Sequence, residues 1–236
     1  MVLISRLISG LAIAATAVSG AAIAKRAVIG HDAVVGFAQA VPSTTAGALY
    51  LKYKPYLKVS NGCVPFPAVD ARGNTGGGLK TSGSSNGGCS SSTGQVYARG
   101  ASINGKYAIM YSWYMPKDSP GPGLGHRHDW ENAVVWLDSA STSAKVVGMA
   151  VSQHGGYETS RSGTFSGNSP LVGYVSYVVV NHQLVFTNTK GGQQPLIAWE
   201  SLTDAARTAL TNTDFGSATV PFKDSTFLSN LGKAAV

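Results

Sequence analysis

The chain has 236 residues, of which 44% are hydrophobic and only 12% are charged, and its formal net charge at pH 7 is +7. This length suffices for one domain with a well-buried core, and nothing in the composition requires two. After residue 26 no two Lys or Arg residues are adjacent, whereas a nucleic-acid-binding protein gathers such residues on a basic stripe with interleaved aromatics. We therefore expect no nucleic-acid partner.

The first 24 residues have the pattern of a secretory signal peptide. They contain one charged residue, Arg6, then an apolar stretch over residues 7–18 and a small-residue end, "SGAAIA". A membrane anchor is the alternative, but this apolar part is shorter than the roughly 20 residues that a membrane-spanning helix needs. We predict a signal peptide over residues 1–24, with a further dibasic processing site at Lys25-Arg26. The expected mature chain is a secreted domain over residues 27–236.

The two cysteines, Cys63 and Cys89, lie in a Gly/Ser-rich segment over residues 61–95. In a secreted chain an even pair is most simply a disulfide, which would hold this segment as an ordered surface loop. Closing a loop of about 25 residues contributes roughly 3–4 kcal/mol, mainly by restricting the unfolded chain. Two cysteines are too few for a zinc site built of thiolates.

Short apolar segments between turn-forming residues predict a β-rich fold. The segment 107–115, "YAIMYSWYM", is apolar on both faces, as in a strand buried on both sides. Further strands are predicted over residues 132–137, 145–152, 173–180 and 184–187. Because no long helical patterns separate these segments, a parallel α/β sheet is disfavoured. We predict a mainly β, single-domain antiparallel β-sandwich with a few peripheral helices.

Helical periodicity appears only near the C-terminus. In "WESLTDAARTALTN", residues 199–212, Ser201 is the expected N-cap, with Asp204 three residues later. The apolar residues expected on one face of this helix are Leu202, Ala205, Ala206, Ala209 and Leu210. A second short helix is predicted over residues 227–234.

Ligand-type side chains crowd together in "GLGHRHDWE", residues 123–131. The chain should be extended from Asp129, so Asp129 and Glu131 should share one face of a strand, roughly 7 Å apart. His126 has the opposite parity, but it leaves a Pro/Gly loop where strict alternation is not yet imposed. The same loop doubles back and lets Asp118, at the end of the preceding strand, approach the same point.

Three carboxylates and one imidazole gathered at one point favour a divalent cation. Packed acids repel one another and need a counter-charge, and oxygen-rich ligation prefers Ca²⁺, Mg²⁺ or Mn²⁺ over zinc. The predicted ligands are Asp118, His126, Asp129 and Glu131. Arg127 and His128 are expected to orient the carboxylates or to face a partner. A metal-free polar network, in which Arg127 pairs with the acids, is the alternative.

An enzymatic function is disfavoured. "HRHDWE" nearly matches the His-x-His…Glu motif of cupin metalloenzymes, which are also β folds. The later histidines, His154 and His182, lack the second Gly/Pro-punctuated motif of that class. No nucleophile and base pair points to a hydrolase either. We therefore expect a protein that is not an enzyme, with a cupin-type metalloenzyme as an alternative.

Several segments resemble the necrosis- and ethylene-inducing-like proteins, secreted cytolysins of plant-associated microbes. "GHRHDWE", residues 125–131, is similar to the family's heptapeptide, and the segment from Ala108 to Arg127 is similar to its immunogenic peptide. Two further segments resemble the family, "CVPFPAVDARGNTGGGLK" and "LIAWESLTDAARTALTNTDFGSATVPF". The resemblance extends to the C-terminus, and the single pair Cys63 and Cys89 suggests the type 1 subgroup.

This resemblance implies a β-sandwich akin to actinoporins and a cation held by Asp118, His126, Asp129 and Glu131. It implies binding to the sugar headgroup of plant glycosylinositol phosphorylceramides, lysis of eudicot cells, and sensing of the segment from Ala108 to Arg127 by a plant immune receptor. Asn181 and His182 match a pair that lines the family's sugar site.

One position departs from the family pattern. Val178 stands where many members have a tryptophan, a side chain that stacks on sugars and anchors at membrane interfaces. A glycan-binding or immune-eliciting member without lytic activity is therefore the main alternative to a cytolysin.

Overall fold

The computed structural model describes residues 26–177 and 180–236. The predicted signal peptide and two of the residues discussed above, Lys25 and Val178, lie outside the described residues. Within the described ranges, no helix combines the length and the apolar character that a membrane span requires.

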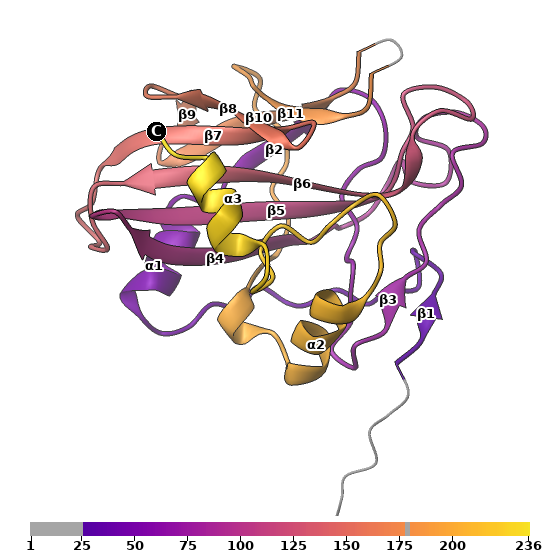
Figure 1. Cartoon of the computed structure of the whole chain (residues 1–236), viewed down its shortest axis with the longest axis horizontal. Helices are drawn as coiled ribbons and strands as arrows, with labels where there is room; N and C mark the ends of the chain where they lie inside the picture. The colour runs from indigo at the N-terminus through magenta and orange to yellow at the C-terminus, as the bar shows by residue number, and fades with distance from the viewer. Residues whose placement is uncertain (1–25, 178–179) are drawn as a thin grey trace, which may run out of the picture.

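The larger of the two main sheets has six strands in the order β12, β4, β5, β6, β7, β8 (Figure 1). Their bounds are Leu196–Ala198, Val96–Ile103, Lys106–Asp118, His126–Leu137, Val146–Gln153 and Gly156–Ser160. The long central strands β5 and β6 are antiparallel neighbours and are buried along nearly their whole length. Burial of both faces accounts for the apolar character of residues 107–115 on both sides.

A smaller sheet covers one face of this one. It contains β11, β10 and β2, with β9 paired to β10; the bounds are Gln183–Phe186, Ser169–Val175, Tyr56–Val59 and Phe165–Ser166. Its residues Tyr174 and Leu184 join the same hydrophobic core as β5 and β6. A separate pair of short strands, β1 (Val28–Ile29) and β3 (Thr75–Gly76), lies at the periphery.

The opposite face of the large sheet is covered by the C-terminal segment, whose helix α3 (Phe227–Lys233) crosses in front of the central strands in Figure 1. Trp136 Nε1 donates a hydrogen bond of 2.8 Å to the carbonyl of Ala234, which fixes the end of this segment to β6. Two other helices lie around the sheets, α1 (Thr45–Lys52) and α2 (Asp204–Asn212).

The mainly β, single-domain prediction is confirmed, with one refinement. Each main sheet is chiefly antiparallel but takes one parallel strand at its edge: β12 pairs with β4, and β2 pairs with β10. More than a hundred residues separate β2 from β10, and such long connections permit parallel pairing where a tight hairpin does not.

Several element boundaries differ from the sequence-based prediction. The strand predicted over residues 173–180 is β10, which ends at Val175. The N-cap of α2 is Thr203 and not Ser201, because the Thr203 hydroxyl accepts the Ala206 N–H while Ser201 lies in a 3₁₀ turn. The predicted second helix is α3, which ends one residue earlier than expected.

Candidate functional site

The paired ends of β5 and β6 carry the four predicted ligands. In the antiparallel register Asp118 lies opposite His126, while Asp129 and Glu131 follow along β6. His128 has a left-handed backbone, with φ of 62°, which breaks the regular alternation of side chains between the two faces. His126 can therefore share the face of Asp129 and Glu131 although it lies within the strand, which explains why simple parity did not place it there.

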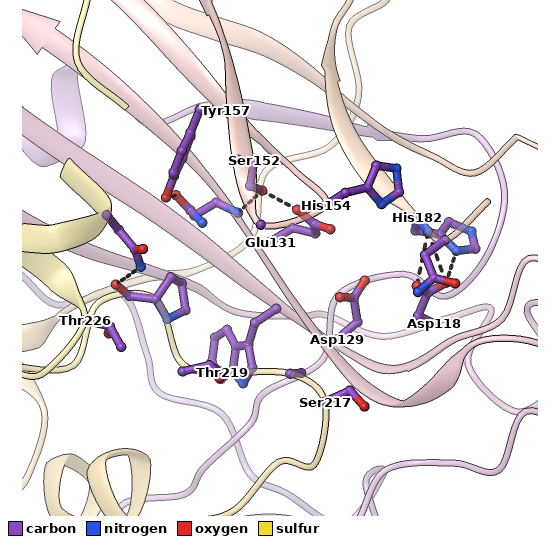
Figure 2. Close-up of a pocket in the computed structure, with 18 of the residues that line it drawn as sticks. Asp118, Asp129, Glu131, Ser152, His154, Tyr157, His182, Ser217, Thr219 and Thr226 are labelled. Atoms are coloured by element: carbon purple, nitrogen blue, oxygen red, sulfur yellow. Dashed lines mark hydrogen bonds and ion pairs between the residues drawn. The ribbon is translucent and has the colours of Figure 1, made fainter. Parts of the chain in front are cut away.

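All four of these residues line one cavity of about 500 Å³ at this end of the sandwich. Figure 2 labels the three acids among them. Asp118 is 1% exposed, and Asp129 and Glu131 are each 6% exposed. The walls combine segments that are distant in sequence, namely the turn between β7 and β8, Asn181 and His182, and residues 217–233 of the C-terminal segment. The four predicted ligand residues thus border the same cavity.

Each acid is held by a hydrogen-bond donor from outside its own hairpin. His182 donates to Asp118 from its backbone N–H at 3.1 Å and from Nδ1 at 2.6 Å. The Tyr174 hydroxyl donates to Asp129 Oδ2 at 2.7 Å. The Ser152 hydroxyl donates to Glu131. These donors fix the three carboxylates in place, and none of them is a Lys or Arg side chain.

Burial and repulsion from neighbouring acids disfavour ionisation of Asp129 and Glu131. Burial, and next the charge of Asp118, raise the pKa of Asp129 to about 7. Burial, followed by the charge of Asp129, raises the pKa of Glu131 well above its ordinary value. Among the described residues no Lys or Arg forms an ion pair with any of the three acids. A cation in the cavity would supply the missing counter-charge.

His126 presents the nitrogen that a metal ligand uses. Its Nδ1 lies 2.7 Å from the carbonyl oxygen of His128, and because a carbonyl can only accept, Nδ1 carries the proton. The lone pair of Nε2 is then free, 3.6 Å from Asp118 Oδ2. A backbone hydrogen bond that fixes the tautomer in this way is usual for metal-binding histidines.

The two residues next to His126 lie elsewhere. Arg127 is exposed and its Nη1 donates to the carbonyls of Gly77 at 2.7 Å and Gly78 at 3.2 Å. It therefore does not pair with the acids, and the metal-free network built on Arg127 is wrong. His128 does not line the cavity; its Nδ1 lies 2.6 Å from the Tyr114 hydroxyl, and burial is the main cause that lowers its pKa to about 4. His128 therefore acts on the carboxylates only through the backbone of β6.

Asn181 and His182 both border the cavity, but the side chain of His182 has no solvent-exposed surface. The His182 ring stacks on Tyr174 with centroids 4.6 Å apart. Its Nε2 has no hydrogen-bond partner among the described residues and faces Gly62, where a Cβ would collide with the ring. His182 thus positions Asp118, and Asn181 is the more exposed of the two residues.

The donor set fits a divalent cation in its chemistry and in sharing one cavity. In residues 26–177 and 180–236, however, no three Asp, Glu, His or Cys side chains converge tightly enough to form a ready-made metal cluster. The assignment of Asp118, His126, Asp129 and Glu131 as ligands therefore stays a prediction.

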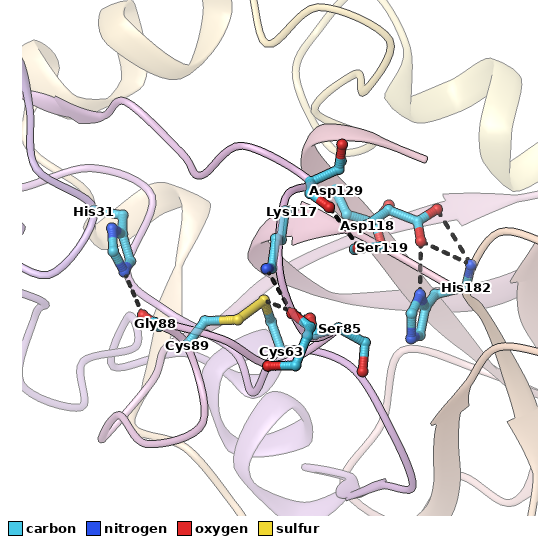
Figure 3. Close-up of a disulfide and its surroundings, with 12 residues drawn as sticks. His31, Cys63, Ser85, Gly88, Cys89, Lys117, Asp118, Ser119, Asp129 and His182 are labelled. Carbon is cyan, nitrogen blue, oxygen red and sulfur yellow. Dashed lines mark hydrogen bonds and ion pairs between the residues drawn. A yellow bond between two sulfur atoms is a disulfide. The ribbon is translucent and has the colours of Figure 1, made fainter. Parts of the chain in front are cut away.

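The predicted disulfide between Cys63 and Cys89 is present, and it closes a loop that braces the site (Figure 3). Lys117, only 1% exposed, donates from Nζ to the carbonyl of Ser84 at 2.9 Å. On the other side of Asp118, the Ser119 hydroxyl donates to the Thr81 carbonyl at 3.3 Å. The loop therefore contacts both neighbours of Asp118 along the chain.

Removing this disulfide should loosen the loop and lower the melting temperature. Replacing both Cys63 and Cys89 by Ser should cost roughly 3–4 kcal/mol, on the chain-entropy argument, and lower Tm by about 10 °C for a domain of this size. Calorimetry of the double variant against the unmodified chain measures this. A change in Tm under about 2 °C would show that the loop needs no covalent closure.

Comparison with known proteins decides the family. The family model described as "Necrosis inducing protein (NPP1)" matches residues 47–234. This chain belongs to the NPP1 necrosis-inducing protein family. The resemblance to necrosis- and ethylene-inducing-like proteins is thereby confirmed.

Relatives within the NPP1 family are close in sequence and fold. A protein named Necrosis-inducing protein NPP1, from Phytophthora nicotianae, is 54% identical over 90% of this chain and 93% of its own length. NLPPya, solved in complex with mannosamine, is 51% identical with a TM-score of 0.85, covering 89% of this chain and 100% of that one. A protein described as non-toxic, HaNLP3, is 41% identical with a TM-score of 0.83, covering 87% and 98%.

Sequence reasoning missed some residues of the candidate site in this NPP1-family chain. Ser152, Tyr174 and the cavity-lining residues of the C-terminal segment belong to strands and loops 20 to 100 residues from the heptapeptide. No local pattern connects a Ser on β7 or a Tyr on β10 with an acid on β6, so only the fold brings them together.

Proposed function

We propose that this chain is a secreted cytolysin that binds the headgroup of plant glycosylinositol phosphorylceramides through a divalent cation and then disrupts eudicot plasma membranes. The observation that carries the proposal is the cavity, in which three buried acids face His126 without any paired Lys or Arg among the described residues. Membership of a family of necrosis-inducing proteins supports the proposed toxicity to plant cells. The amino-sugar complexes of NLPPya support a sugar as the ligand.

The ion would be Ca²⁺, Mg²⁺ or Mn²⁺, held by Asp118, Asp129 and Glu131 with Nε2 of His126. When bound, it would neutralise the carboxylates and offer coordination to sugar hydroxyls. The chain itself supplies the orientation: His182 holds Asp118, Tyr174 holds Asp129 and Ser152 holds Glu131. Asn181, on the wall of the same cavity, would hydrogen-bond the sugar.

Exposed apolar side chains in loops next to the site fit an approach to a membrane. Leu124, two residues before His126, is 47% exposed, and Tyr177, between β10 and Asn181, is 58% exposed. Apolar and aromatic side chains of this kind contact the boundary between lipid headgroups and acyl chains. They would bring the cavity to the bilayer surface.

The plant immune receptor proposed as a second partner would recognise the segment from Ala108 to Arg127. Every residue from Tyr107 to Asp118 is buried in β5. Recognition of this strand therefore requires that the protein first unfold or be cleaved.

Leakage from lipid vesicles tests the proposed function. Vesicles containing the plant sphingolipid should release an entrapped dye when the protein and Ca²⁺ or Mg²⁺ are added, and vesicles lacking the sphingolipid should not. An excess of EDTA should stop the release. Leakage that is indifferent to both the sphingolipid and EDTA would contradict the proposal.

A non-lytic glycan-binding protein is the second candidate function. The non-toxic description of HaNLP3, at 41% identity, supports it, because the fold alone does not ensure toxicity. The two functions separate in the same experiment: the second predicts binding to sphingolipid vesicles without dye release. A metalloenzyme of cupin type would instead turn over a substrate, and nothing in the cavity or the relatives supports that alternative.

A further inference from the structure

A second pocket opens beside the main cavity, between two glycine-rich loops. It is lined by Lys80, Thr81, Ser82, Gly83, Pro122, Gly123, Gly125, His126 and Arg127 and measures about 620 Å³. The two loops are joined by a hydrogen bond of 2.9 Å from Gly123 N to the Thr81 carbonyl. We call this the side pocket. Its walls are thus fixed to each other although they come from segments 40 residues apart.

The side pocket has the opposite charge to the main cavity. Its lining contains two cations, Lys80 and Arg127, and no Asp or Glu. Both cations are exposed, and among the described residues neither forms an ion pair. Arg127 is held in place by the carbonyls of Gly77 and Gly78 through Nη1 alone. Its other guanidinium nitrogens make no hydrogen bond to a described side chain or carbonyl, so they can serve an anion.

Backbone geometry keeps the side pocket open. Gly83 and Gly123 both have left-handed φ, of 77°, and a Cβ added at either would meet no atom within 4 Å. The space next to these two glycines is therefore not filled by any neighbouring side chain or backbone segment. A ligand could approach the chain closely at these two glycines.

His126 belongs to the walls of both cavities. One ligand could therefore extend from the acids across His126 to Lys80 and Arg127. Such a ligand needs hydroxyl groups or another neutral part at one end and a negative charge at the other. A sugar joined to a phosphate has this arrangement.

We propose that the side pocket is an anion subsite that binds the phosphate of the headgroup whose sugar lies in the main cavity. This rests on the proposed function, since it takes the sugar end of the ligand from there. Lys80 supplies a point charge and Arg127 supplies the planar donors that suit phosphate oxygens. The side pocket thus sets the orientation of the headgroup, with the lipid chains leaving past the loop that carries Leu124.

Calorimetric titration with a matched pair of probes tests this subsite. Glucosaminyl-inositol and glucosaminyl-inositol 1-phosphate differ only in the phosphate. The unmodified chain should bind the phosphorylated probe about 10-fold more tightly at low salt, a gain that 0.5 M NaCl should largely remove. Lys80→Glu should abolish this gain and leave the affinity for the unphosphorylated probe unchanged. The matched control is Lys145→Glu, exposed at the opposite end of β6, which should keep the gain.

Equal effects of Lys80→Glu and Lys145→Glu would overturn the subsite, because they would indicate only long-range charge. If neither glycan binds the unmodified chain, the proposed function fails, and inorganic phosphate then decides the subsite separately. In that case, NMR shifts of the Gly83 and Gly123 amide resonances on addition of phosphate, absent in Lys80→Glu, would show that the side pocket binds free phosphate. No shift in the unmodified chain would overturn it.

Discussion

Replacing Glu131 by Gln should reduce lysis of eudicot cells by at least about 100-fold, because a neutral amide removes one of the three charges that would hold the proposed cation. Gln keeps the size of Glu and can still accept the Ser152 hydroxyl, so the cavity should keep its shape. Relief of repulsion from Asp129 should also keep the ion-free fold at least as stable. Lysis is measured as electrolyte leakage from leaf discs, with circular dichroism to check the fold.

The matched control is Glu158→Gln. Glu158 is exposed on β8, just beyond Tyr157 of the cavity wall, and bonds Gln153 instead of an acid of the cluster. The Glu158→Gln substitution changes the net charge by the same amount as Glu131→Gln, and it should leave lysis intact. Full lysis by Glu131→Gln would remove this acid from the ion site, and loss of lysis in both variants would point to a general charge effect.

In the presence of EDTA, the unmodified chain should lose stability as the pH rises from 6.5 to 8.5. The folded-state pKa of Asp129, about 7, lies above its unfolded value, so folding favours the protonated form and this contribution disappears as the pH passes the folded pKa. Glu131 acts in the same direction. The loss should be about 1 kcal/mol, or roughly 2–4 °C in Tm. His128, with its pKa lowered to about 4, opposes this only below about pH 6.5.

Asp129→Asn isolates the effect, because an amide cannot ionise. Its Tm in EDTA should change less over this pH range than that of the unmodified chain, whereas Asp32→Asn, at an exposed residue that does not line the cavity, should change like the unmodified chain. Adding Ca²⁺ or Mg²⁺ at pH 8.5 should restore the lost stability in the unmodified chain and in Asp32→Asn, but not in Asp129→Asn. Parallel curves for Asp129→Asn and the unmodified chain would show that Asp129 ionises without strain and needs no counter-charge.

The sequence was most informative where one short segment decides the outcome. The apolar run in β5 and the acid spacing in β6 predict a buried strand and a shared face, and both are found. The disulfide followed from the count of cysteines and is also found. The family was recognisable from the heptapeptide, since that resemblance needs no knowledge of the fold.

The rest of the site depends on tertiary structure. β4 was not predicted because its sequence, "VYARGASI", mixes polar and small residues, and it forms a strand through pairing with β5 and β12. Thr203 is the N-cap of α2 because Ser201 lies within the preceding 3₁₀ turn. The bond from His182 to Asp118 spans 64 residues, and no spacing rule connects residues so far apart.

The most direct test of the central claim is the amount of divalent metal bound to the purified chain at pH 7.5. Isothermal titration with Ca²⁺, Mg²⁺ and Mn²⁺ after removal of metal, with elemental analysis of the loaded protein, measures it. We expect one ion per chain for the unmodified protein and for Glu158→Gln, and none for Glu131→Gln. No binding of any of the three ions by the unmodified chain at millimolar concentration, or equal binding by Glu131→Gln, would contradict the proposal that the three acids and His126 hold a cation.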